Sequence, residues 1–123
     1  MVIFDANAIL RYILQDDEKS AASVKEKINE TRCLVPTEVI AEVVYVLTKL
    51  YKVSRADTAR VIEKFLLLEN VSAMETSIVL HGLRAYASTK LDFIDCVLSG
   101  YQMQGYSIFT FDKKLQSYLE SIA

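Results

Sequence analysis

The sequence predicts a single α/β domain over residues 1–123, with a parallel sheet of about four to five short strands covered by helices on both faces. Short apolar runs alternate along the chain with longer segments in which apolar residues recur at helical spacing. The length of 123 residues and the hydrophobic content of 52% are sufficient for one buried core. Three Gly and one Pro are too few for a loop-rich all-β domain.

The sequence predicts two strand–helix units in the first half of the chain. Residues 2–4 form a β-prone run, and Asn7 is predicted to cap the helix that follows. An acidic stretch then precedes a helix over residues 19–30, and residues 33–35 form a second strand. Residues 37–50 are predicted to be helical despite their β-branched content, because their polar side chains fall on one stripe at steps of four, three and four: Glu38, Glu42, Tyr45 and Lys49.

The second half continues the alternation of helices and strands. Ser54 and Asp57 form a capping pair for a helix that ends near residue 69, and residues 71–73 form a third strand. Two helices follow, over residues 76–87 and 92–104, and the second stops at Gly105. The remaining elements are a fourth strand over residues 107–110 and a last helix that runs to about residue 122.

Charge and composition exclude several classes of protein. A formal net charge of −2 argues against a protein that coats nucleic acid by charge alone, although it allows an enzyme that acts on nucleic acid. No apolar run is long enough to cross a bilayer, and Asp5 stands where a signal peptide carries basic residues, so we expect a cytoplasmic protein without a membrane partner. Cys33 and Cys96 lie in apolar surroundings and are predicted to be reduced core residues.

Acidic residues follow the predicted strands and begin the predicted helices. Asp5 and Asp112 come just after the first and the last strand, and Asp92 and Asp95 share one face of a helix start. In a parallel sheet these positions meet at the carboxyl edge, where ligands bind. Each acid also has a simpler role available, because Asp5, Asp92 and Asp112 are good helix caps and Glu42 fits a solvated stripe.

A cluster of such acids is typical of a metal site. Carboxylates about 4 Å apart repel by roughly 4 kcal/mol at an effective dielectric of 20, so a cluster has to hold protons or a cation. Oxygen ligands without nearby His or Cys favour Mg²⁺ or Mn²⁺. A metal of this kind activates water and supports displacement at phosphorus, which indicates phosphodiester hydrolysis.

Four blocks of the chain carry a resemblance to a known family. They are VIFDANAILRYI, LVPTEVIAEVVYVL, KLDFIDCVLSG and FTFDKKL, and together they extend over nearly the whole chain. In these blocks the chain resembles a PIN-domain ribonuclease of the VapC toxin type. The resemblance implies that Asp5, Glu42, Asp95 and Asp112 are the catalytic acids that hold Mg²⁺ or Mn²⁺, with Asp92 as an auxiliary acid.

The same resemblance implies supporting residues and partners. Asn7 and Thr110 match polar positions that orient the carboxylates or a bound water, and Arg11 is expected near the site edge, where it contacts RNA or an antitoxin. Proteins of this type cleave RNA, form homodimers and are inhibited by a VapB-type antitoxin. Further basic residues are available for the RNA backbone: Lys49, Lys52, Arg55, Arg60, Lys113 and Lys114.

Two other functions fit parts of the sequence. FDANAI superficially resembles the first motif of a haloacid-dehalogenase-like phosphatase, in which Asp5 is the nucleophile, but Asn7 and Ile9 replace two of its motif residues. A PIN-like binding module without catalysis is the second alternative, although all four acids are present. The chain has a single histidine, His81, and lacks the other residues of a Ser-His-Asp catalytic triad or an HExxH zinc site. It also has no glycine-rich motif for nucleotide binding.

Overall fold

The computed structural model describes all 123 residues and contains a three-stranded parallel sheet. Its strands are β1 (Val2–Ile3), β2 (Cys33–Val35) and β3 (Val71–Ala73), in the order β1-β2-β3. In the register, Val2 pairs with Cys33 and Cys33 with Val71. The α/β class is therefore as predicted, while the number of strands is three rather than four to five.

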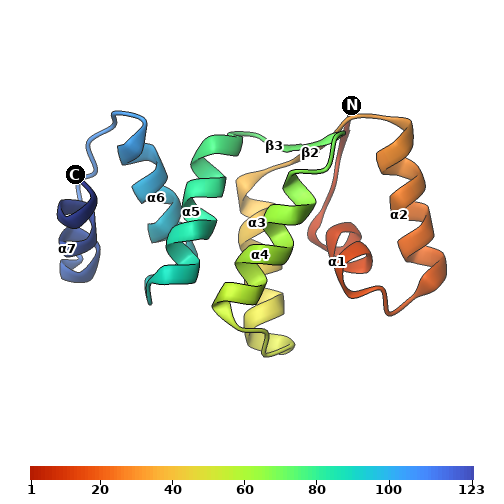
Figure 1. Cartoon of the computed structure of the whole chain (residues 1–123), viewed down its shortest axis with the longest axis horizontal. Coiled ribbons are helices and arrows are strands. Elements are labelled where there is room, and N and C mark those ends of the chain that lie inside the picture. The colour runs from red at the N-terminus through yellow and green to blue at the C-terminus, as the bar shows by residue number, and fades with distance from the viewer.

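Helices connect and flank the strands, as the class requires. In Figure 1 they follow one another along the long axis of the molecule, from α2 at one end to α7 at the other. No helix combines the length and apolarity needed to span a membrane. The helices are α1 (Ala6–Leu14), α2 (Glu18–Glu30), α3 (Thr37–Tyr45), α4 (Arg55–Leu66), α5 (Thr76–Ser88), α6 (Phe93–Met103) and α7 (Lys113–Ile122).

The predicted fourth strand is wrong. Residues 107–110 have no regular secondary structure and pair with no strand, and Phe109 and Phe111 are 87% and 85% exposed. The segment links α6 to α7 at one end of the molecule, whereas the amino terminus that leads into β1 lies beyond α5 and α3 (Figure 1). Local β-propensity is therefore present without a neighbouring strand to pair with.

The helix after β2 also differs from the prediction. The predicted helix over residues 37–50 is α-helical only to Tyr45 and continues as a π-helical turn, η1 (Val46–Leu50). The wider turn is closed by the Tyr51 N–H, which donates to Val46 O at 3.2 Å, and Thr48 Oγ1 donates back to Val44 O at 2.8 Å. Thr37 begins α3 without a side-chain cap, since Pro36 occupies the cap position.

One apolar core runs through the molecule and includes both cysteines as free, buried thiols, as predicted. Within this core, helices α5 and α6 pack against each other at very short distance. A Cβ at Gly100 would lie 2.5 Å from Ile78 O, so this position admits no side chain without displacing α5. Tyr86 and Phe93 close the same interface with their rings edge to face at 5.9 Å.

Arg55 ties the start of α4 to the loop between α5 and α6. Its guanidinium lies 3.6 Å from the centre of the Tyr86 ring, Nε donates to Tyr86 O at 3.0 Å, and Nη2 donates to Leu91 O. These contacts occupy the side chain and fix the backbone immediately before Asp92. Arg55 is therefore a structural residue whose guanidinium is engaged within the chain.

We expect Arg55→Ala to lower the free energy of unfolding by about 2 kcal/mol, because the cation–π contact and two charge-assisted hydrogen bonds are lost together. Arg60→Ala is the matched control, since Arg60 forms only an exposed ion pair with Asp57, and it should change stability by less than about 0.5 kcal/mol. Urea unfolding followed by circular dichroism measures both. Equal stability of the two variants would contradict the anchoring role of Arg55.

Candidate functional site

Two of the predicted acids cap helices at their amino termini. Asp5 Oδ1 accepts the Ala8 N–H at 2.9 Å at the start of α1, and Asp112 Oδ1 accepts the Leu115 N–H at 3.0 Å at the start of α7. Asp5, rather than the predicted Asn7, is therefore the cap of α1. Both carboxylates are exposed, and each keeps its second oxygen free of hydrogen bonds from the protein. Capping and ligand binding are thus compatible at these positions.

Asp92 and Asp95 lie at the start of α6. Asp92 occupies the cap position with an exposed side chain that makes no capping hydrogen bond, and Asp95 is half-buried in the first turn. Burial raises the pKa of Asp95, and the negative charges of Asp92 and Asp112 raise it further. The charges of Asp92, before α6, and Asp112, before α7, are therefore near enough to Asp95 to act on its carboxyl group.

Glu42 and Asp5 do not join this group. Glu42 is exposed on α3, and neither Glu42 nor Asp5 is among the charges that shift the pKa of Asp95. The oxygen-only donor set suits a hard divalent cation. However, no three Asp, Glu, His or Cys side chains approach closely enough to hold a metal ion. The arrangement within one chain therefore does not fit a bound metal.

Hydrogen bonds around Thr110 shape the turn before Asp112. Thr110 Oγ1 accepts the Asp112 N–H at 3.0 Å, and Gln116 Nε2 donates to Thr110 O at 2.6 Å. Thr110 thus orients the backbone that carries the Asp112 carboxylate. Sequence reasoning missed Gln116, although its position one turn after Asp112 on the same helix was a usable signal.

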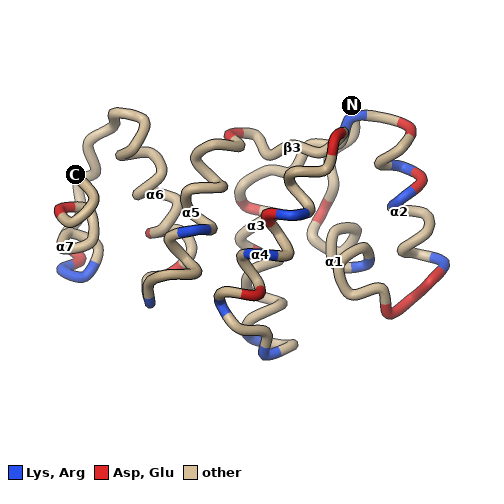
Figure 2. The backbone as a smooth tube through the Cα atoms, in the orientation of Figure 1, with Lys and Arg blue, Asp and Glu red and all other residues tan.

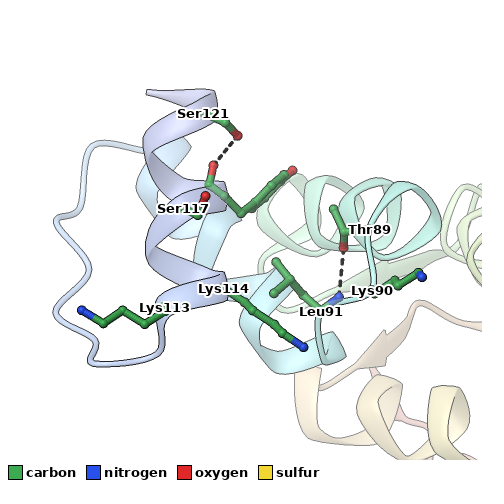
Figure 3. A pocket seen from close by; sticks show the side chains of 8 residues that line it. Thr89, Lys90, Leu91, Lys113, Lys114, Ser117 and Ser121 are labelled. Atoms are coloured by element: carbon green, nitrogen blue, oxygen red, sulfur yellow. Dashed lines mark hydrogen bonds between the residues drawn. The ribbon is translucent and has the colours of Figure 1, made fainter.

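A lysine-bearing pocket of about 510 Å³ lies between α7 and the loop before α6. Lys90 and Leu91 on its rim lead directly into Asp92, while Lys113 and Lys114 follow Asp112. In Figure 3 the Lys114 side chain extends towards the loop that carries Lys90 and Leu91, whereas Lys113 points away from it. Lys90 was missed in the sequence, where nothing distinguishes it from other surface lysines.

Arg11 and Asn7 lie on α1, in a different environment. Arg11 Nη1 is 3.7 Å from Asp17 Oδ2, and a hydrogen bond from Ser20 together with this cation lowers the pKa of Asp17. Asn7 is exposed, makes no side-chain hydrogen bond and shares a pocket of about 230 Å³ with Arg11 and Tyr51. These two predicted residues therefore neighbour each other, while the lysine-bearing pocket is lined by other residues.

A comparison with models of known protein families identifies the family of this chain. The family model of the PIN domain matches residues 2–119, and the protein therefore belongs to the PIN domain family. PIN domains are generally metal-dependent nucleases that act on RNA or DNA. Searches among curated proteins and among solved structures found no match.

The charge on Asp95 should destabilise the fold at neutral pH. Since its pKa is raised above the ordinary 3.8, the folded protein binds this proton more tightly than the unfolded chain does, and stability falls as the pH rises past that value. We therefore expect Asp95→Asn to raise the free energy of unfolding by up to about 1 kcal/mol at pH 7, reduced by solvent screening, and to have no such effect below about pH 3.

Asp57→Asn provides the control, because Asp57 is the third residue of α4 just as Asp95 is the third residue of α6. That variant loses the favourable helix-dipole and Arg60 interactions and should be slightly less stable. Thermal unfolding across this pH range compares the two proteins. A lower melting temperature for Asp95→Asn at pH 7 would contradict this account of the repulsion.

Proposed function

We propose that the protein is an endoribonuclease that hydrolyses RNA phosphodiesters with Mg²⁺ or Mn²⁺ and acts as the toxin of a toxin–antitoxin pair. The observation that carries the proposal is the neighbourhood of Asp92, Asp95 and Asp112 in a chain of the PIN family. A cleaving nuclease needs such acids, whereas a module that only binds RNA gains nothing from negative charge. The family match likewise favours a nuclease over a phosphatase.

The proposed catalytic acids are Asp5, Glu42, Asp95 and Asp112, with Asp92 in an auxiliary role. Support comes from their chemistry and accessibility, because all are carboxylates and none is fully buried. Mg²⁺ and Mn²⁺ are the ions that such oxygen donors prefer. Asn7 and Thr110 are proposed as supporting polar residues, and Thr110 already hydrogen-bonds to the backbone of Asp112.

The lysine-bearing pocket is the proposed contact for the RNA backbone. Lys90 and Lys114 lie two residues from Asp92 and Asp112 in the sequence, and their positive charges would attract an RNA phosphate towards this part of the molecule. Elsewhere acidic and basic residues are interspersed along the chain, as Figure 2 shows, so the affinity for RNA depends on local contacts rather than on net charge.

The proposed partner that inhibits the toxin is a VapB-type antitoxin. The exposed carboxylates of Asp5, Glu42, Asp92 and Asp112 would attract a basic side chain from such a protein. Arg11 and Asn7 are proposed as contacts on α1, where they line the pocket of about 230 Å³. The toxin role itself depends on the resemblance of the four sequence blocks to VapC proteins.

Cleavage of labelled total RNA by the purified protein tests the activity. We expect cleavage with Mg²⁺ or Mn²⁺, none with EDTA, and a loss of at least about 100-fold in Asp5→Asn, because this variant removes the negative charge of a proposed catalytic acid but keeps a capping group. Asp57→Asn is the control acid and should cleave normally, since Asp57 pairs with Arg60 on α4. Full activity of Asp5→Asn would exclude the proposed site.

A second experiment tests the RNA contact. We expect Lys114→Ala to raise KM by about threefold to tenfold with little change in kcat, since one phosphate contact is lost. The slope of log K for RNA binding against log salt concentration should also decrease by about one. Lys19→Ala is the control, because Lys19 is exposed on α2 at the opposite end of the molecule (Figure 1). Identical salt dependence in both variants would argue against this RNA path.

A further inference from the structure

A mainly apolar pocket of about 330 Å³ lies where α1, α2 and α4 meet. Five of its eight lining residues are hydrophobic: Tyr12 and Ile13 from α1, Val61 and Phe65 from α4, and Leu68 just after α4. In Figure 1 α1 lies between α2 and α4, away from α6 and α7. This pocket is therefore separate from the lysine-bearing pocket and from the acids that begin α6 and α7.

Two aromatic rings form the fixed part of the apolar pocket. Tyr12 and Phe65 meet edge to face with ring centres 5.2 Å apart, and the Phe65 ring also lies 6.4 Å from that of Phe4. Gln15, which ends α1 with a φ of 53°, donates from Nε2 to Tyr12 O at 3.0 Å. Since these contacts exist without a ligand, little conformational freedom is lost when one binds.

Two lysines without ion pairs line the same pocket. Lys25 comes from α2 and Lys64 from α4, and both are exposed. The four ion pairs of the chain involve other residues, so neither ammonium group has a carboxylate partner. No Asp or Glu lines the pocket. A ligand that enters it therefore meets an apolar wall, two positive charges and no negative one.

We propose that this pocket binds a medium-chain fatty acid, with its alkyl chain against Tyr12 and Phe65 and its carboxylate held by Lys25 and Lys64. The volume is near the lower end of the range for small-ligand pockets, about 300–1,000 Å³, which suits a chain of about eight carbons rather than a large cofactor. Apolar lining and unpaired cations match the two ends of such a molecule.

A protein segment fits the same lining less well. A peptide brings backbone N–H groups that need acceptors when they are buried. Among the lining side chains that are not charged, only Tyr12, Gln15 and the residues of the apolar wall remain, and just the first two carry an acceptor. A fatty acid needs donors at its carboxylate alone, and the lysines supply them. The proposal does not depend on nuclease activity.

Calorimetric titration with ligands that differ in one feature tests the proposal. We expect octanoate to bind with one-to-one stoichiometry and hexanoate to bind about 15-fold more weakly, since each buried methylene contributes about fourfold. The uncharged 1-octanol should bind at least about threefold more weakly than octanoate, and acetate should not bind. No binding of octanoate, or equal affinities for octanoate and 1-octanol, would overturn the proposal.

The carboxylate contact is tested by Lys25→Gln and Lys64→Gln. Each substitution should weaken octanoate binding by about threefold to tenfold and leave the affinity for 1-octanol unchanged. Lys27→Gln is the matched control, because Lys27 is also exposed on α2 but pairs with Glu30 and does not line the pocket. Unchanged affinity for octanoate in both pocket variants would contradict the assignment.

The apolar contact is tested by Val61→Phe. The added ring occupies space in the pocket, so binding of octanoate and of 1-octanol should be lost, and circular dichroism should be unchanged because Val61 is only half-buried. Full binding by the folded variant would overturn the proposal, and if this variant does not fold, the lysine variants still decide. A short peptide of two leucines between two glutamates is titrated alongside; binding of this peptide without binding of octanoate would identify a site for a protein segment instead.

Discussion

Pairing of β2 with a strand on each side is the interaction on which the rest of the structure depends. Leu34 O accepts the Phe4 N–H on one side, and the Cys33 N–H donates to Asn70 O at 2.7 Å on the other. Val35 is completely buried at the centre of this strand. Because all three strands are parallel, their carboxyl ends lie at one edge, and α1, α3 and α5 each begin just beyond it. The position of Asp5 follows directly from this pairing.

The other acids depend on a different set of contacts. Asp92 and Asp95 are placed by α6, which packs against α5 with so little space that Gly100 admits no side chain. Arg55 holds the loop before Asp92 through Leu91 O and the Tyr86 ring. The acids are therefore carried by two well-packed parts of the molecule, the sheet and the pair α5–α6. Joining them requires a contact between these parts rather than a local rearrangement of side chains.

The sequence was sufficient to predict elements whose structure is decided locally. The capping pair of Ser54 and Asp57 is confirmed, with the Asp57 N–H donating to Ser54 Oγ at 3.1 Å, and the strands at residues 33–35 and 71–73 lie where the apolar runs placed them. It failed where structure depends on a distant partner. Residues 107–110 have the composition of a strand, but a strand exists only with a neighbour, and none is within reach along the chain.

The same distinction applies to the candidate site. Asp5 and Asp112 were correctly placed at helix starts, because a capping residue before a helical segment is a local pattern. Whether acids converge depends on which strands are adjacent, and that information is not local. Lys90 escaped notice for a related reason: its relevance comes from lining one pocket together with residues of α7, and nothing in its sequence neighbourhood marks it.

Electrostatics gives a physical reason for keeping the acids apart within the folded chain. Carboxylates gathered at about 4 Å repel by roughly 4 kcal/mol per pair at an effective dielectric of 20, which is a large fraction of the stability of a domain of this size. A chain that keeps Asp5 and Glu42 away from Asp95 folds without most of this cost. The separation of these acids therefore lowers the electrostatic cost of folding the chain.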